Sequence, residues 1–250
     1  MRIARIALMG ALLGALVHTA PARAEVAAQN WSFDGPFGTY DRASLQRGYQ
    51  VYSEVCSNCH SLKYLSYRNL EDIGLSETQV KAIAAAATVP GDMDENGTVH
   101  DRGGLPSDHF QPPFPNDNAA RFANNGALPP DQSSLVNARD DGPDYIYGVL
   151  TGYVTPPAGY IVPDGMNYNA AFPGHNIAMP QPLQDDQVTY TDGTKATLQQ
   201  ESHDVVTFLT WAANPELEQR KRMGVHVIFF LILLTGVVYA LKRKIWAAVH

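Results

Sequence analysis

The longest hydrophobic run of the chain lies near its carboxyl end, at residues 223–241. As a helix this run would be about 28 Å long, which matches the hydrocarbon core of a bilayer. Basic clusters flank it at 220–222 and 242–244, and Trp246 follows at a position typical of an interfacial anchor. Because a buried core helix would not carry basic clusters at both ends, the pattern predicts one transmembrane helix.

A shorter hydrophobic run begins the chain at residues 6–17, shortly after Arg2 and Arg5. It is too short to span a bilayer. The Ala-Arg-Ala at 22–24 fits the pattern of small residues at which signal peptides are cleaved. Residues 1–24 are therefore predicted to be a secretory signal peptide, which directs the following domain out of the cytoplasm.

These two runs divide the chain into three predicted parts. After the signal peptide, residues 25–217 form one exported domain, and residues 218–250 form the membrane anchor with a short cytoplasmic tail. Within the domain, apolar residues recur every three or four positions in short segments, as in amphipathic helices. The predicted helices cover 42–56, 76–87, 118–124, 132–139, 144–151 and 199–213, and the Pro- and Gly-rich stretches 89–118 and 155–187 are predicted loops.

The first predicted helix leads directly into the two cysteines of the chain. Asp41 is placed to cap its start, and Leu45, Gly48, Tyr52 and Val55 fall on one face at helical spacing. A glycine inside a helix costs about 0.5–1 kcal/mol relative to alanine. Gly48 therefore indicates that this face packs closely against another helix.

Charge is distributed unevenly along the chain, whose formal net charge is −7. Residues 25–217 hold 24 acidic and nine basic side chains, a net charge of −15. Such a surface is unlike that of nucleic-acid-binding proteins, which need basic residues to neutralise phosphates. The charge instead favours a basic protein as partner.

The strongest chemical signal is Cys56-Ser57-Asn58-Cys59-His60, which contains the only two cysteines of the sequence. The pattern C-x-x-C-H is the attachment site of a c-type haem. Its two thiols add to the porphyrin vinyl groups, and the adjacent histidine coordinates the iron. One covalently bound haem c is therefore predicted. A zinc site or a redox dithiol are the alternatives, but neither a second ligand pair nor a βαβ pattern accompanies the motif.

An electron-carrying haem normally has a second axial ligand, usually methionine or histidine. Met93 lies in a polar stretch and Met223 lies at the membrane boundary, which leaves Met166 and Met179. Met179 is followed by a proline and preceded by apolar residues, which favours a rigid loop. The residues alone leave both methionines open, with Met179 preferred.

Several further motifs, in this order, resemble those of the cytochrome c1 family, the haem subunits of ubiquinol–cytochrome c reductase (bc1) complexes. The resemblance is to the α-proteobacterial type and covers about residues 31–246. The motifs are 47–52 (RGYQVY), 114–116 (FPN), 119–121 (AAR), 123–131 (ANNGALPPD), 144–147 (DYIY), 172–174 (FPG), 178–180 (AMP) and 208–211 (FLTW).

The resemblance implies a fold and a set of haem contacts. The fold is mainly α, a class I-type cytochrome c domain with long loop insertions plus one C-terminal transmembrane helix. Met179 is implied as the sixth iron ligand beside His60. Some bacterial members have an additional disulfide near the haem, which a chain with two cysteines cannot form, so packing and prolines alone are expected to hold its methionine loop. The implied haem contacts are Arg139 on a propionate, Asn124 and Tyr145 along the haem, and a carbonyl of Pro129 or Pro130 on the other His60 nitrogen.

The function implied is one-electron transfer within the bc1 complex. The haem would accept an electron from the Rieske iron–sulfur protein and pass it to a soluble or membrane-bound cytochrome c. The remaining expected partners are cytochrome b and membrane lipid, and the expected location is a bacterial inner membrane with the haem domain in the periplasm. The alternatives are a membrane-anchored cytochrome c subunit of a terminal oxidase, and a gas sensor or peroxidase with an open sixth position.

Overall fold

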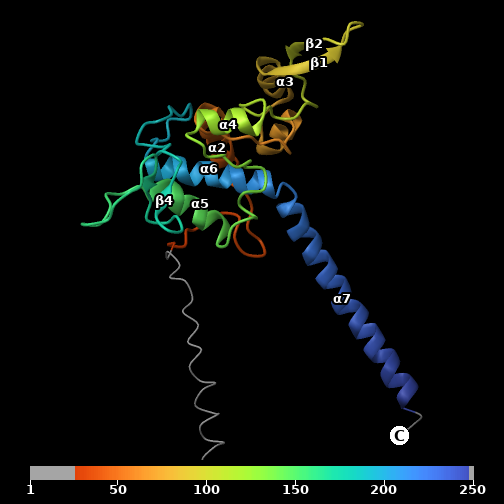
Figure 1. Ribbon diagram of the computed structural model, residues 1–250. Coiled ribbons are helices and arrows are strands. Elements are labelled where there is room, and N and C mark those ends of the chain that lie inside the picture. The colour runs from red at the N-terminus through yellow and green to blue at the C-terminus, as the bar shows by residue number, and fades with distance from the viewer. Residues whose placement is uncertain (1–25, 248–250) are drawn as a thin grey trace, which may run out of the picture.

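The computed structural model describes residues 26–247, so the predicted signal peptide at 1–24 lies outside the described residues. The described part is mainly helical, with four short strands in two separate pairs, which confirms the predicted fold class. Three helices form its centre: α2 (Arg42–Glu54), α5 (Gly142–Thr151) and α6 (Leu198–Ala213). Helix α6 contacts both of the others, and Figure 1 shows it crossing the middle of the domain.

Helices α2 and α6 approach each other closely at Gly48, where α2 has no side chain. A Cβ atom placed on Gly48 would lie 2.0 Å from the carbonyl oxygen of Asp204 and 2.8 Å from the Cβ of Phe208. The close packing expected at this position is therefore confirmed. The start of α2 is also as predicted, because the Asp41 carboxylate accepts the N–H of Ala43 at 2.9 Å.

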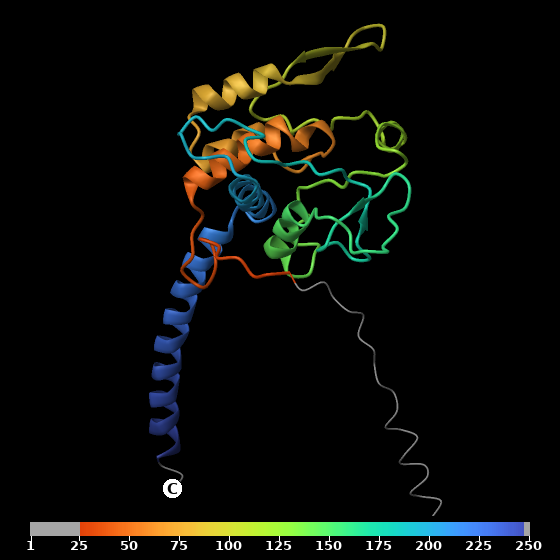
Figure 2. The same ribbon diagram turned by 90° about the vertical axis from the view of Figure 1, so that its left-hand side faces the viewer.

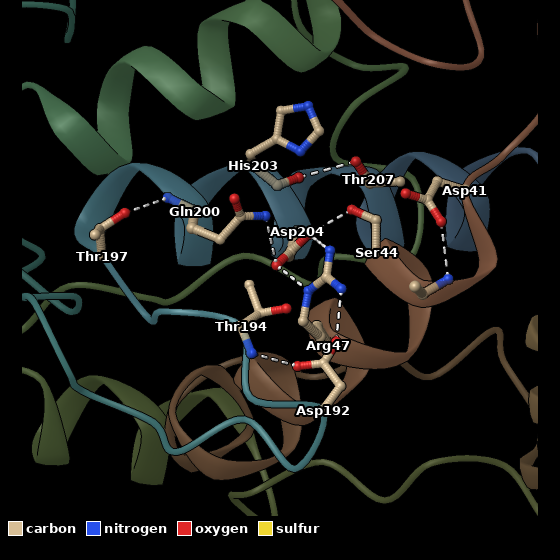
Figure 3. A network of polar contacts seen from close by, with 11 residues as sticks. Asp41, Ser44, Arg47, Asp192, Thr194, Thr197, Gln200, His203, Asp204 and Thr207 are labelled. Atoms are coloured by element: carbon tan, nitrogen blue, oxygen red, sulfur yellow. Dashed lines mark hydrogen bonds and ion pairs between the residues drawn. The ribbon is translucent and has the colours of Figure 1, made fainter.

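A buried ion pair joins the same two helices. Arg47 of α2 donates to the Asp204 carboxylate of α6 through Nε at 2.8 Å and Nη2 at 3.1 Å. Ser44 donates to the same carboxylate. The third Arg47 nitrogen reaches Asp192, on the segment that leads into α6, at 2.9 Å (Figure 3). Because the Asp204 side chain has no solvent exposure, its charge depends on these donors.

Helix α7 (Leu217–Trp246) contains the predicted transmembrane run. Among residues 26–247 it is the one helix long and apolar enough to cross a membrane. Its first turns are fixed to the chain that precedes α2. Glu218 accepts the N–H of Tyr40 at 2.8 Å, and the Lys221 ammonium donates to two carbonyls of the loop 33–38. Figure 2 shows this loop beside the upper end of α7, so the anchor is joined to the domain by more than one connection.

Two further helices follow the sequence pattern. Helix α3 (Glu77–Ala86) begins after Ser76, whose hydroxyl and backbone form a capping box with Gln79. Helix α4 (Asp117–Ala123) begins after Asn116, whose side chain accepts the N–H of the third helical residue. In both cases a local cap determines where the helix starts.

The helix predicted over residues 132–139 is wrong, because this stretch forms a series of turns. Its polar groups bind partners outside the stretch. The Asn137 amide donates to the carbonyl of Ala213 at 3.2 Å, and the N–H of Ser133 donates to the Asp131 carboxylate at 3.0 Å. Side-chain bonds of this kind compete with helix formation.

The loop predicted over 89–118 is also partly wrong, because it contains an antiparallel hairpin. Strand β1 (Thr88–Met93) pairs with β2 (Val99–Gly103), with Thr88 opposite Gly103. Nearly every residue of the hairpin is exposed, so the alternation of apolar and polar residues that marks a half-buried strand is missing. In Figures 1 and 2 the hairpin projects from the end of the domain away from α7.

Four short elements complete the fold around the long loops. The 3-10 helices η1 (Cys56–Asn58) and η2 (Tyr67–Ile73) follow α2 along the chain. Strands β3 (Asn167–Tyr168) and β4 (Asn176–Ile177) pair within the second predicted loop. Each is too short to give a periodic signal in the sequence.

We expect Gly48→Ala to lower the free energy of unfolding by about 1–3 kcal/mol, because the added methyl group must displace the Asp204 backbone or Phe208. Gly224→Ala in α7 is the matched control, since a Cβ there would meet no atom within 4 Å. Denaturant unfolding of the full-length protein in detergent measures both variants. Equal stability of Gly48→Ala and the unaltered chain would contradict the close crossing.

Candidate functional site: the Cys56–His60 turn

The segment from Cys56 to His60 forms a tight turn at the end of α2. The carbonyl oxygen of Cys56 accepts the N–H of Cys59 at 3.1 Å and the N–H of His60 at 2.8 Å. Cys56 is buried and Cys59 is exposed, and neither takes part in a disulfide. The turn therefore brings two free thiols and an imidazole together, which is the donor set that a c-type haem requires.

A backbone carbonyl from a distant segment holds the imidazole of His60. The Nδ1 atom lies 2.8 Å from the carbonyl oxygen of Pro130. Of the two prolines that the sequence left open, the partner is thus Pro130 and not Pro129. When Nδ1–H donates to this carbonyl, Nε2 keeps its lone pair for a metal.

The protonation state of His60 also suits a metal ligand. Burial lowers the pKa of His60, although the Pro130 carbonyl and the charge of Asp131 act in the opposite direction. A lowered pKa keeps the ring neutral at neutral pH, and only the neutral ring can coordinate a metal.

Asp131 joins the segment that contains Pro130 to the segment that follows His60. Its carboxylate accepts the Ser61 hydroxyl at 2.7 Å, the Lys63 N–H at 3.1 Å and the Ser133 N–H at 3.0 Å. Burial raises the pKa of Asp131, but these hydrogen bonds outweigh it and hold the pKa below its ordinary value. The carboxylate is therefore ionised and fixes the position of Pro130.

The surroundings of Cys56 favour a neutral sulfur. Burial, with a smaller contribution from Cys59, raises the pKa of the Cys56 thiol to about 12. A thiolate would be strongly disfavoured there, whereas a thioether carries no charge and is not penalised by burial. The buried position of Cys56 therefore fits a thioether sulfur that is covalently attached to an apolar group.

The two methionines considered as sixth ligand lie at the same end of the β3–β4 pair. Asn167, the first residue of β3, is opposite Ile177, the last residue of β4. Met166 directly precedes β3 and Met179 follows β4 by two residues, so both methionines lie at this end of the pair. Met166 is 41% exposed, whereas Met179 is partly buried. The difference in exposure favours Met179 as the residue that faces the interior.

The backbone of Met179 is fixed by two side chains that the sequence did not indicate. Its carbonyl oxygen accepts the Tyr153 hydroxyl at 2.9 Å and the Asn167 amide at 3.3 Å. The expectation that packing and prolines alone hold this loop is therefore incomplete. Neither donor lies in a recognisable motif, so no local signal could have identified them.

Arg139 and Tyr145 lie close together. Arg139 lowers the pKa of Tyr145, while burial raises it and is the larger effect. Arg139 is exposed and also donates to the carbonyl of Ala138 at 3.1 Å. Asn124 sits elsewhere, at the C-terminus of α4, where its amide donates to the carbonyl of Ala120 at 2.8 Å. The haem contacts of these residues remain predictions.

Within residues 26–247, no three His, Cys, Asp or Glu side chains lie close enough together to hold a metal ion. The zinc alternative therefore has no set of protein ligands around Cys56 and Cys59 in the described part of the chain. The Cys56–His60 turn, with a fixed imidazole and two free thiols, instead fits a metal that arrives with its own macrocycle.

Comparison with known proteins gives a consistent result. The model of the cytochrome c1 family matches residues 31–249. The chain is 47% identical to cytochrome c1 of Rhodospirillum rubrum over 234 residues, which cover 87% of this chain and 86% of the relative. It is also 47% identical to the mitochondrial cytochrome c1 heme protein of Schizosaccharomyces pombe over 220 residues, 88% of this chain and 72% of the relative.

A third relative is longer than this chain. The chain is 46% identical over 242 residues to the cytochrome b/c1 protein of Bradyrhizobium diazoefficiens. The match covers 88% of this chain and spans 35% of that relative's length. This chain is thus similar to one part of a larger protein.

We expect Asp131→Asn to lower the free energy of unfolding at pH 7 by about 1 kcal/mol, because a charged acceptor of three hydrogen bonds is lost. A carboxylate with a lowered folded-state pKa contributes stability above its unfolded pKa of about 3.9 and loses it as pH falls below that value. The difference between the two proteins should therefore shrink between pH 5 and pH 3. Asp164→Asn, an exposed carboxylate, is the control. If the difference in free energy of unfolding stays constant between pH 5 and pH 3, Asp131 does not stabilise the fold through its ionised carboxylate.

Proposed function

The chain belongs to the cytochrome c1 family, and from this premise we propose that it is the membrane-anchored electron-transfer subunit of a ubiquinol–cytochrome c reductase (bc1) complex. One observation carries the proposal. In a chain that matches the family over nearly its whole length, the Cys56–His60 turn has free thiols and an imidazole whose Nδ1 is bound to the Pro130 carbonyl. The family match also argues against the alternative of a terminal-oxidase subunit.

The cofactor of the proposed function is one covalently attached haem c. Cys56 and Cys59 would hold it through thioethers, and His60 would coordinate its iron. When bound, a c-type haem supplies reversible one-electron chemistry. The role of the chain is to fix the orientation of the His60 ring through Pro130, and to exclude water around the buried Cys56.

Met179 is proposed as the second iron ligand, and four further residues, Arg139, Tyr145, Asn124 and Pro129, are proposed as haem contacts. Arg139 carries a guanidinium that can pair bidentately with a propionate, and the nearby Tyr145 supports this assignment. Asn124 is proposed as a haem contact on the strength of its family motif alone. Pro129 would line the haem without binding His60.

The proposed partners follow from the proposed complex and from charge. Electrons would come from the Rieske iron–sulfur protein and leave to a soluble or membrane-bound cytochrome c, while cytochrome b would hold the anchor beside membrane lipid. The subunit would not bind quinol itself. The net charge of −15 over residues 25–217 supports a basic acceptor.

The location proposed is a bacterial inner membrane, with the haem domain at 25–217 in the periplasm. The apolar helix α7 supports the anchor, and its tail would lie in the cytoplasm after removal of the signal peptide at 1–24. The identities to bacterial and mitochondrial relatives are equal. The α-proteobacterial type therefore rests on the sequence motifs and the export pattern.

Replacing Met179 by leucine should leave the haem attached, because the two cysteines are unchanged. It should lower the reduction potential by on the order of 0.1 V or more, since a thioether ligand stabilises ferrous iron. Carbon monoxide should then bind to the reduced protein. Potentiometric titration and carbon monoxide difference spectra measure both effects, with Met166→Leu as the control. If Met166→Leu has these effects and Met179→Leu does not, the ligand assignment is wrong.

The acidic domain should attract a basic electron acceptor over long range. Charge raises the encounter rate, and exposed charges are screened beyond about 8 Å at physiological ionic strength. Stopped-flow reduction of a basic cytochrome c should therefore slow by at least about tenfold from low to high salt. An acidic cytochrome c is the control, and its reduction should accelerate. A rate for the basic acceptor that stays flat or rises would rule out steering by this subunit.

A further inference from the structure

The methionine loop is attached to the domain through the backbone carbonyl of Met179. We propose that Tyr153 and Asn167 are positioning residues, whose hydrogen bonds to this carbonyl keep the Met179 thioether on the iron. This inference rests on the proposed function, because it assumes that Met179 is the axial ligand. Both residues lie outside the recognised motifs, and their hydrogen bonds would determine how strongly Met179 stays bound to the iron.

The first donor comes from the end of helix α5. Tyr153 follows Gly152, the C-terminal cap of α5, and its hydroxyl donates to the Met179 carbonyl at 2.9 Å. The ring is partly buried, and a buried tyrosine hydroxyl needs a partner of this kind. The bond therefore connects the Met179 backbone to the packed helices of the domain.

The second donor comes from the strand next to the methionine. Asn167 is paired with Ile177, two residues before Met179, and its amide donates to the Met179 carbonyl at 3.3 Å. The same carbonyl thus accepts two bonds from two different segments. Such an arrangement limits both the position and the orientation of the peptide group.

The strand that carries Asn167 is itself fixed to α5. Asn169 is fully buried, and its amide donates to the carbonyl of Val149 at 2.7 Å. Its side-chain oxygen accepts the N–H groups of Ala171 and Phe172, each at 3.0 Å. Both donors to Met179 therefore belong to one rigid frame that starts at the C-terminal end of α5.

This frame takes the place of a covalent connection. The chain has two cysteines, and both are assigned to the haem, so no disulfide can fasten the methionine loop. The prolines nearest to Met179 restrict the backbone but carry no side-chain group that could donate a hydrogen bond. Loss of a donor should shift the equilibrium from bound toward dissociated methionine, by about fivefold for one hydrogen bond.

The test uses three single variants in the full-length, haem-loaded protein. Tyr153→Phe and Asn167→Ala each remove one donor to Met179. Tyr160→Phe is the matched control, because the Tyr160 hydroxyl donates to Gly174 of the same loop at 3.1 Å and not to Met179. The methionine–iron charge-transfer band of the oxidised protein is followed as temperature rises, together with carbon monoxide binding to the reduced protein.

We expect Tyr153→Phe and Asn167→Ala each to raise the ratio of dissociated to bound methionine about fivefold. The double variant should raise it further, and Tyr160→Phe should leave it unchanged. The band should vanish at a lower temperature in the two single variants, well before the domain unfolds by circular dichroism. Carbon monoxide should bind faster to the same two proteins.

Three results would overturn the proposal, and measuring Met179→Leu as well separates a wrong positioning role from a wrong ligand assignment. If Met179→Leu removes the band while Tyr153→Phe and Asn167→Ala behave like Tyr160→Phe, methionine ligation stands and the positioning role is wrong. If the two variants lower the unfolding temperature but leave the ratio of dissociated to bound methionine unchanged, the positioning role is also wrong. Tyr153 and Asn167 would then have a structural role only. If Met179→Leu keeps the band, the ligand assignment itself fails.

Discussion

The close crossing of α2 and α6 is the contact on which the rest of the structure depends. Gly48 allows the two backbones to approach, and the buried Arg47–Asp204 pair fixes their register. Helix α2 ends in the Cys56–His60 turn, and α6 leads through one short connection into the apolar helix α7. A shift at the crossing would therefore move the candidate site relative to the anchor.

His60 and Met179, the two proposed iron ligands, are each positioned by residues of loops. For His60, Asp131 fastens the turn whose Pro130 carbonyl binds the imidazole. For Met179, the frame at the end of α5 binds the backbone carbonyl. In both cases a backbone carbonyl is the point of attachment, so the side chains of the two proposed ligands are left available. This explains how a domain with long irregular segments can still define the positions of single residues.

The errors of the sequence interpretation have a common physical cause. The helix expected over 132–139 was lost because its polar groups bind Asp131 and the end of α6. The hairpin of β1 and β2 was missed because an exposed pair of strands lacks a buried face. In both cases contacts or solvent, and not local propensity, decided the backbone conformation.

The sequence by itself determined the features that depend on neighbouring residues. Helix starts were set by caps such as Asp41, the apolar run at 223–241 defined the anchor, and the Cys56–His60 spacing indicated the haem. Only the tertiary structure decided the features that join distant segments. The choice of Pro130 for His60 and of Tyr153 for Met179 depends on how loops 70 and 26 residues apart in the chain come together. A local sequence pattern does not predict such long-range hydrogen bonds, because each of the two bonded residues looks like an ordinary loop residue on its own.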